Sequence, residues 1–150
     1  MNTFMKRAVE LATDNVREGG HPFGAVIVKD GEIVAEGVNE LHLHYDVSGH
    51  AEMLAIRRLQ EQIQSHDLSD YTMYASGEPC PMCFTTMAFA GMTDIYYCAS
   101  VEEAADAGLG KSGEIYADLR NPREERSLQM KKVELEAGFE NPMKLYKESQ

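Results

Sequence analysis

Two β-rich segments joined by a tight-turn dipeptide place the strongest constraint on how this chain folds. The segments FGAVIV (23–28) and EIVAEG (32–37) flank Lys29-Asp30-Gly31, and Asp-Gly is a dipeptide that closes β-hairpins. The run AVIV (25–28) is apolar at every position instead of alternating, which is typical of a strand covered on both faces. The sequence therefore predicts an antiparallel strand pair whose first strand is fully buried.

Helical patterns lie on both sides of this hairpin. Residues 3–18 and 50–63 carry apolar side chains at helical spacing between polar ones. A third helix is predicted from Pro81 to Gly91, because proline is favoured in the first turn of a helix and glycine just beyond its end. We therefore expect three helices in the first two thirds of the chain.

Strands alternate with these helices. We predict strands at 71–76 and 94–99, a further one at 127–137, where SLQMKKVELEA alternates, and a short C-terminal helix in NPMKLYKES. This order predicts an α/β fold, a three-layer α/β/α sandwich with a mixed sheet of roughly five strands. No repeat, low-complexity tract or linker divides the chain, so we expect residues 1–150 to form a single domain.

The charge balance restricts the partners. Fourteen Lys and Arg against 25 Asp and Glu give a net charge of −11, which repels polyanions and disfavours a nucleic-acid partner. No apolar run approaches the roughly 18 residues that a bilayer-spanning helix needs. The first ten residues also lack the apolar core of a signal peptide. We expect a cytoplasmic protein with no membrane partner.

The cysteines indicate metal or redox chemistry. Cys80, Cys83 and Cys98 are an odd number, and two of them lie three positions apart, which fits a metal or redox pair better than a disulfide framework. A Cys-x-x-Cys pair alone could also be half of a structural zinc site. Cys98 lies in a β-rich stretch, where we expect a small core residue.

Three potential zinc ligands stand at the starts of two predicted helices. His50 opens one helix, and Cys80 and Cys83 open the other. Residues three apart share a helix face, so both sulfurs can reach one ion. Unpaired N–H groups and the positive dipole end at a helix start favour thiolate over thiol. Three protein ligands leave a fourth position open, which is typical of a catalytic Zn²⁺ site.

A carboxylate lies beside the first of these ligands. Glu52 follows His50 by two residues, and on a regular helix the two side chains would be roughly 200° apart. They converge only if His50 lies at an irregular helix start. The pattern His50-Ala51-Glu52 with Pro79-Cys80-Pro81-Met82-Cys83 matches the signature of zinc-dependent deaminases, in which the glutamate moves protons and is not a ligand.

At these residues the chain resembles the cytidine and deoxycytidylate deaminase superfamily, and within it the bacterial guanine deaminase-like branch of nucleobase deaminases. The shared segments follow in order along most of the chain: 22–31, Glu36-Gly37, Asn39, 50–52, 55–57, 78–83, 104–105, 107–108 and 122–126. The resemblance implies a cytidine deaminase-like fold and one zinc ion per chain.

Roles for individual residues follow from the resemblance. It implies that His50, Cys80 and Cys83 are the metal ligands and that Glu52 is the general acid and base. The remaining implied roles concern the substrate: Asn39 would hydrogen-bond the base, Phe23 would stack on its ring, and the backbone N–H of Ala51 would contact the group being replaced.

The resemblance also implies a reaction and a substrate class. A free nucleobase or related aminated heterocycle would be deaminated hydrolytically, most simply guanine to xanthine and ammonia. Two departures bear on the base: Phe89 stands where guanine deaminases have a tryptophan, and the sequence GLGKSGE (108–114) has no acidic residue soon after Gly108, so that Glu114 or Asp118 would have to substitute. Loss of an aspartate there would leave donors of guanine unpaired.

Alternative functions share the same metal signature. Adenosine deamination in transfer RNA would need a basic groove, against which the net charge argues, and cytosine or cytidine deamination would be separated by a substrate panel. A zinc-bearing binding module without turnover would not need the carboxylate of Glu52. The resemblance further implies a homodimer, in which the tail folds over the site or exchanges between subunits.

Overall fold

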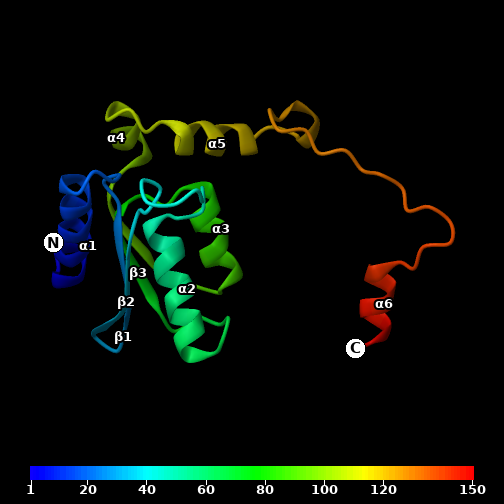
Figure 1. Cartoon of the computed structure of the whole chain (residues 1–150), viewed down its shortest axis with the longest axis horizontal. Coiled ribbons are helices and arrows are strands. Elements are labelled where there is room, and N and C mark those ends of the chain that lie inside the picture. Colours follow the sequence, from blue (N-terminus) through cyan, green and yellow to red (C-terminus); the bar gives the residue numbers. More distant parts are fainter. The chain divides into compact units, whose positions relative to one another are not determined.

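The predicted hairpin lies within a sheet of four strands (Figure 1). The structure is a computed structural model that describes residues 1–150. Strand β1 (Gly24–Lys29) pairs antiparallel with β2 (Glu32–Val38). Asp30 and Gly31 between them have φ values of 51° and 77°, the pair of positive angles that a tight type I′ turn requires. The first five residues of β1 are buried, which confirms the prediction of a strand covered on both faces.

The sheet is mixed, as predicted. Its strand order is β2-β1-β3-β4, with β3 spanning Thr72–Gly77 and β4 spanning Ile95–Ala99. Strand β1 is antiparallel to β3, whereas β3 and β4 are parallel. Parallel neighbours need a crossover connection, and helix α3 (Pro81–Phe89) provides it, beginning with Pro81 in its first turn.

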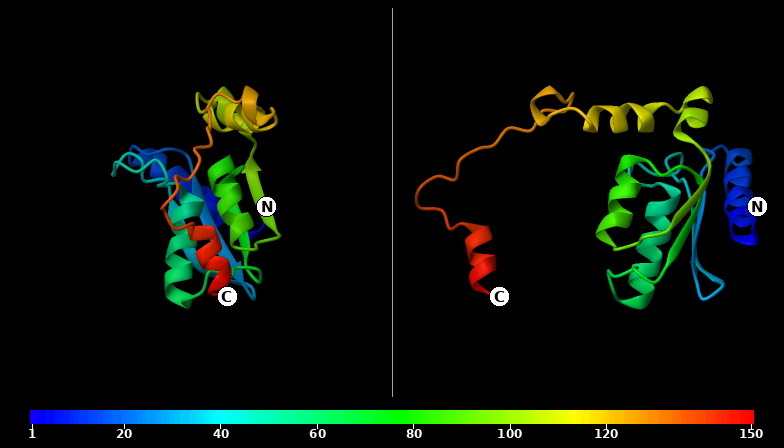
Figure 2. Two further views of the ribbon diagram at one scale, coloured as in Figure 1. Left: turned by 90° about the vertical axis from the view of Figure 1, so that its right-hand side faces the viewer. Right: turned by 180° about the vertical axis from the view of Figure 1, so that it is seen from behind.

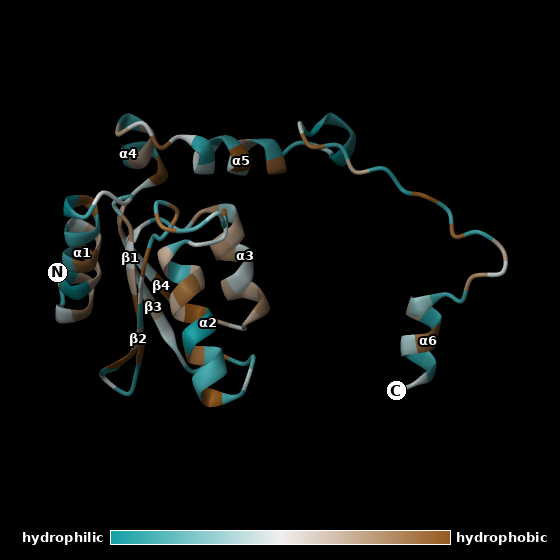
Figure 3. Ribbon diagram, in the orientation of Figure 1, coloured by the Kyte–Doolittle hydropathy of each residue, from teal (hydrophilic) through white to brown (hydrophobic).

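Helices cover both faces of the sheet and give three layers. Helix α1 (Thr3–Arg17) packs on one face, and α2 (Ala51–Ile63) lies with α3 on the other (Figures 1 and 2). Hydrophobic and hydrophilic residues alternate along the ribbon of α2, as expected for a helix with one buried face (Figure 3). The largest fully buried side chains are Val26, Ile27, Ile56, Leu59, Leu68, Met73, Cys83 and Met87.

All regular secondary structure in the last third of the chain is helical. Helix α4 (Val101–Asp106) and α5 (Lys111–Leu119) follow the sheet, then a single 3-10 turn η1 (Arg123–Glu125), and α6 (Pro142–Glu148) confirms the predicted C-terminal helix. The chain divides into two compact units, Met1–Ala117 and Asp118–Gln150. None of the helices combines the length and the apolar composition that crossing a bilayer requires.

One predicted strand does not form. Residues 127–137 are irregular, and the sheet has four strands where roughly five were expected. An extended segment becomes a strand only by hydrogen bonding to a neighbouring strand, and the unit Asp118–Gln150 contains no other strand. Its alternating apolar residues Leu128, Met130, Val133 and Leu135 are all exposed.

The prediction that Cys98 is a core residue is wrong. Cys98 is exposed, and so are its neighbours Tyr96 and Tyr97. The reason is that β4 is an edge strand of the sheet. Its β-rich composition does not reveal that its side chains are left exposed there. Cys98 therefore belongs to the surface and takes no part in the hydrophobic core.

Candidate metal centre and active site

Sheet topology brings four chain segments to one end of the molecule. Phe23 comes just before β1, Asn39 just after β2, and Cys80 just after β3. Because β1 runs antiparallel to both β2 and β3, its beginning lies beside their ends. The loop after β2 leads into α2, so the N-terminus of that helix, with His50, is at the same end.

His50 lies at the irregular start of α2. It is the N-cap residue with extended backbone angles, φ −84° and ψ 153°, and the helix proper begins at Ala51. The angular separation of roughly 200° that a regular helix would impose on His50 and Glu52 therefore does not apply. His50 thus lies at the irregular helix start that its convergence with Glu52 requires.

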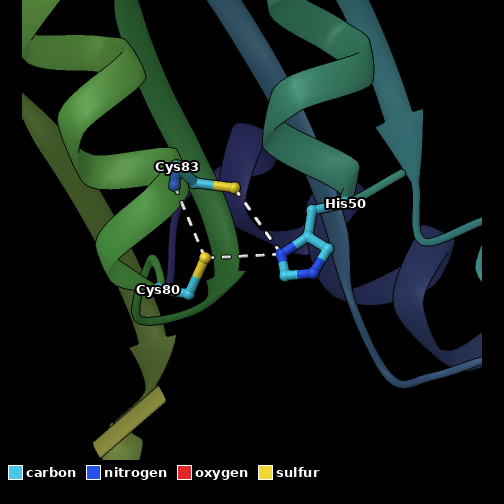
Figure 4. A group of neighbouring side chains, drawn as sticks. All are labelled: His50, Cys80 and Cys83. Carbon is cyan, nitrogen blue, oxygen red and sulfur yellow. Dashed lines mark hydrogen bonds between the residues drawn. The ribbon is translucent and has the colours of Figure 1, made fainter. Parts of the chain in front are cut away.

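Both cysteines lie at the start of α3 and face His50 (Figure 4). Cys80 is the N-cap, and the backbone N–H of Cys83 donates to its sulfur at 3.4 Å. The Nδ1 atom of His50 is 3.4 Å from the Cys80 sulfur and 3.7 Å from the Cys83 sulfur. The three predicted ligands thus form one cluster, with their donor atoms within 4.8 Å of one another.

These distances fit a tetrahedral zinc ion. Zinc bonds of about 2.3 Å to sulfur and about 2.0 Å to nitrogen, at tetrahedral angles, imply a nitrogen-to-sulfur distance of about 3.5 Å. Both measured separations, 3.4 and 3.7 Å, lie close to that value. The donor set of one imidazole and two thiols is also one that zinc prefers, so the residues present fit the metal.

The electrostatics of the cluster favour a negatively charged sulfur. A hydrogen bond from Cys83 lowers the pKa of the Cys80 thiol to about 4, and His50 lowers it further. The same bond, together with burial, raises the pKa of Cys83. The hydrogen bond with Cys80 also raises the pKa of His50. A cation entering the cluster therefore meets one thiolate and displaces the proton that the two sulfurs share.

Glu52 is a buried carboxyl group beside this cluster. Only 6% of the residue is exposed. Burial raises its pKa to about 7, the negative charge of Cys80 acts in the same direction, and His50 and a hydrogen bond with Cys83 act in the opposite one. A carboxyl group with a pKa near neutrality both accepts and releases a proton readily at physiological pH.

Phe23 and Asn39 lie next to each other. The backbone N–H of Asn39 donates to the carbonyl of Phe23 at 3.1 Å. The Phe23 ring packs on Gly77, and a β-carbon at Gly77 would be 2.8 Å from the ring. Asn39 is 2% exposed, and its Oδ1 accepts from the N–H of Leu41 at 3.0 Å, which leaves the Nδ2 group as a donor.

Ala51 contributes its backbone. It is fully buried and is the first residue of α2, so its N–H is one of the four that have no partner inside the helix. Because Ala51 stands between His50 and Glu52, its N–H lies at the end of α2 where the metal cluster is.

Sequence reasoning missed Tyr116. Its hydroxyl donates to the carbonyl of Pro79, the residue before Cys80, at 2.6 Å, and so connects α5 to the cysteine loop. Burial raises the pKa of Tyr116 to about 12, and the negative groups Cys80, Glu78, Cys83 and Glu52 add to the shift. The phenol therefore stays neutral and remains a donor. No motif marks this tyrosine, because the contact depends on how α5 returns over the loop.

The first 99 residues match the family model of the cytidine and deoxycytidylate deaminase zinc-binding region. This match spans the hairpin, His50, Glu52 and both cysteines of the cluster. The chain belongs to the cytidine and deoxycytidylate deaminase family. The family resemblance inferred from the sequence is confirmed, and with it the zinc-binding character of the domain.

Several characterised members of this deaminase family are similar over most of the chain. A guanine deaminase of Bacillus subtilis is 44% identical over 134 residues, which are 89% of this chain and 85% of that protein. A crystal structure of Bacillus subtilis guanine deaminase superposes with a TM-score of 0.89 and 40% identity, covering 99% of this chain and 95% of the other. A tRNA-specific adenosine deaminase of Streptococcus pyogenes is 30% identical over 95% of this chain and 87% of its own length.

Proposed function

We propose that this protein is a zinc-dependent aminohydrolase of free nucleobases or related aminated heterocycles. The observation that carries the proposal is the buried carboxyl group of Glu52 beside three zinc-type donors that leave a fourth position for a small ligand. A purely structural zinc site would fill all four positions and would not need a buried carboxyl group that is no ligand. The combination supports hydrolysis.

In this proposal His50, Cys80 and Cys83 hold the metal and Glu52 moves protons. A zinc ion held by these three residues would act as a Lewis acid and lower the pKa of a water molecule to about 7. The Glu52 carboxylate accepts a proton from the attacking water, and the resulting carboxylic acid protonates a ring nitrogen of the base. The oxygen of the water becomes bonded to the ring carbon. Glu52 then carries the second proton of the water from this hydroxyl to the amino group, the carbon–nitrogen bond breaks as a C=O bond forms, and ammonia leaves.

Three further residues orient the base in the proposal. The Phe23 ring, fixed against Gly77, provides a flat apolar surface on which a heterocycle stacks. Asn39 donates from Nδ2, because its oxygen is already bonded to Leu41. The free N–H of Ala51 at the start of α2 binds the group that is being replaced.

Guanine is the first substrate to test. The similarity to Bacillus subtilis guanine deaminase extends over nearly the whole fold and supports this choice. The segment 108–114 has Lys111 and Ser112 where acidic residues were expected, so the groups that bind the far edge of the base differ. A different pattern of donors there would shift preference toward a base with fewer exocyclic amines.

Two other deaminase activities are alternatives. Adenosine deamination in transfer RNA is favoured by the similarity to the Streptococcus pyogenes enzyme, but the net charge of −11 opposes a polyanionic substrate. Cytosine or cytidine deamination uses the same zinc cluster and proton carrier. A zinc-bearing binding module is the non-enzymatic alternative, and it predicts base binding without ammonia release.

The test is ammonia release by the zinc-loaded protein from a panel of guanine, guanosine, adenine, cytosine, cytidine and an aminotriazine, with an adenosine-containing tRNA anticodon stem alongside. Turnover of guanine supports the leading assignment. Turnover of another free base keeps the chemistry and changes the substrate. Turnover of the RNA alone, or of nothing while zinc is bound, contradicts the proposal.

The assembly and location belong to the same proposal. We propose that residues 1–150 act as one deaminase domain in a homodimer. Support comes from exposed apolar side chains in the unit Asp118–Gln150, among them Phe139 and Tyr146, and from the outer edge of β4, which has no partner strand. A cytoplasmic location would keep the thiols of Cys80 and Cys83 reduced and able to bind metal. Light scattering of the purified chain tests the dimer.

A further inference from the structure

One buried polar side chain on α1 lies among apolar ones. Asn15 is 3% exposed, whereas the other buried residues of this helix are Met5, Ala8 and Ala12. A buried amide is costly unless its hydrogen bonds are satisfied. The Nδ2 group of Asn15 uses both of its hydrogens: it donates to the carbonyl of His21 at 2.8 Å and to the carbonyl of Asn39 at 2.9 Å.

These two carbonyl groups belong to the segments that carry Phe23 and Asn39. The carbonyl of His21 also accepts from the N–H of Phe23 at 2.8 Å, and the N–H of Asn39 donates to the carbonyl of Phe23 at 3.1 Å. Together with the two bonds from Asn15, these contacts form a closed ring of hydrogen bonds. Asn15 supplies the only side chain in this ring of hydrogen bonds, and it connects the segment that carries Phe23 with the segment that carries Asn39.

The surroundings of Asn15 leave little freedom. The N–H of Gly20 donates to the backbone carbonyl of Asn15 at 2.8 Å, in the turn that follows the end of α1. A β-carbon at Gly20 would be 2.5 Å from Nδ2 of Asn15 and equally close to the ring of His42. The amide is therefore enclosed by the helix end on one side and by the loop after β2 on the other.

We propose that Asn15 is a positioning residue that fixes Phe23 and Asn39 relative to each other for binding the base. The inference rests on the proposed function, because it needs both residues to contact the substrate. A single nitrogen with two hydrogens aimed at two carbonyls is the feature that a smaller or acidic side chain lacks. Without it, the two segments are held together only from the sheet side, by their direct backbone bond and the adjoining β1–β2 ladder, and the distance between the Phe23 ring and the Asn39 amide is less constrained.

The test is a double-mutant cycle on kcat/KM for the best substrate of the panel. Asn15→Ser and Asn15→Asp are each made in the wild-type chain and in Asn39→Ala. We expect each Asn15 change to lower kcat/KM about tenfold in the wild-type chain, mostly through KM, as the loss of one to two hydrogen bonds implies. In Asn39→Ala the same changes should cost less than about twofold. The Asn39 amide is then absent, and it is one of the two groups whose separation Asn15 sets.

Arg7→Met is the matched control. Arg7 also connects α1 to the sheet, through an ion pair with Glu36 at 2.6 Å, but it touches neither carbonyl. We expect it to lower the melting temperature and leave kcat/KM within about twofold of wild type. Zinc content and cooperative melting establish that each variant is folded, and with two substitutions at Asn15 a single variant that fails to fold does not remove the comparison.

Three results would overturn the inference. Asn15 changes that cost the same factor in both backgrounds would show a purely structural role while leaving the proposed function intact. An Arg7→Met variant with the same rise in KM would show that any loosening of α1 has this effect. An Asn39→Ala variant as active as wild type would instead contradict the proposed role of Asn39, and the positioning role with it.

Discussion

The ring of Phe23 packs against Gly77 so closely that a β-carbon at position 77 would be 2.8 Å from ring atom Cε1 and 2.9 Å from Cδ1. Gly77 is the last residue of β3, three positions before Cys80, so this contact joins the proposed base-stacking ring to the strand that leads into the metal loop. A side chain at this position would displace the ring.

Replacement of Gly77 tests that contact. We expect Gly77→Ala to lower kcat/KM about 10- to 100-fold, because a shift of the ring by about 1 Å misorients the base. Gly31→Asn, in the hairpin turn, is the control, since a β-carbon at Gly31 has no atom within 4 Å and asparagine tolerates the left-handed φ of 77° there. Steady-state kinetics of the two variants make the comparison, and equal kcat/KM values for both would show that the ring does not depend on Gly77.

The three cysteines should separate into two classes. Cys80 lies in the metal cluster, whereas Cys98 is exposed on the edge strand. We expect Cys80→Ser to weaken zinc binding more than about 100-fold and Cys98→Ser to leave it unchanged. Zinc content after dialysis against a chelator of graded strength measures both. Loss of zinc in Cys98→Ser, or its retention in Cys80→Ser, would contradict the assigned ligand set.

Removal of the metal should act on stability as well as on activity. The cluster joins the starts of α2 and α3, which otherwise share few contacts, and a ligand that binds only the folded state raises its stability. We expect the chelated protein to melt at a lower temperature and to regain both its melting temperature and its activity when Zn²⁺ is returned. Differential scanning fluorimetry with and without chelator checks this, and an unchanged melting temperature would argue against a metal held between the two helices.

The ion pair of Arg7 and Glu36 makes stability depend on pH. The hydrogen bond from Arg7 lowers the pKa of Glu36 below its ordinary value. A lowered carboxyl pKa stabilises the fold above the unfolded value and loses this contribution as the pH falls through the folded value. Both side chains are about 40% exposed, so the total is small. We therefore expect the melting-temperature difference between wild type and Arg7→Met to be largest at neutral pH and to be lost progressively as the pH falls below the ordinary pKa of a glutamate and through the lowered pKa of Glu36.

Much of the fold could be predicted because its local signals agree. The hairpin has a turn dipeptide and two apolar segments, and α3 has proline at its start, so pattern and propensity lead to the same assignment. Residues 127–137 alternate as a strand does, but a strand also needs a partner, which no local pattern supplies. Cys98 illustrates the same limit, because only the strand order reveals that β4 is an edge.

The candidate site divides in the same way. The zinc cluster was predictable because His50, Cys80 and Cys83 have the chemistry and spacing of ligands, and the extended N-cap at His50 supplies the convergence that their sequence required. Asn15 and Tyr116 were not predictable. Their partners are backbone carbonyls 24 and 37 positions away, and a carbonyl group leaves no mark in the sequence.

Glu52→Gln most directly tests the proposal that Glu52 moves the protons of the reaction. Glutamine keeps the size of the side chain but cannot accept and return a proton, and Glu52 is not among the cluster donors. We expect this variant to bind one zinc ion per chain, as the wild type does, with the rate of ammonia release lowered at least about 1,000-fold. A variant that binds zinc and still releases ammonia within about tenfold of the wild-type rate would contradict this proposal.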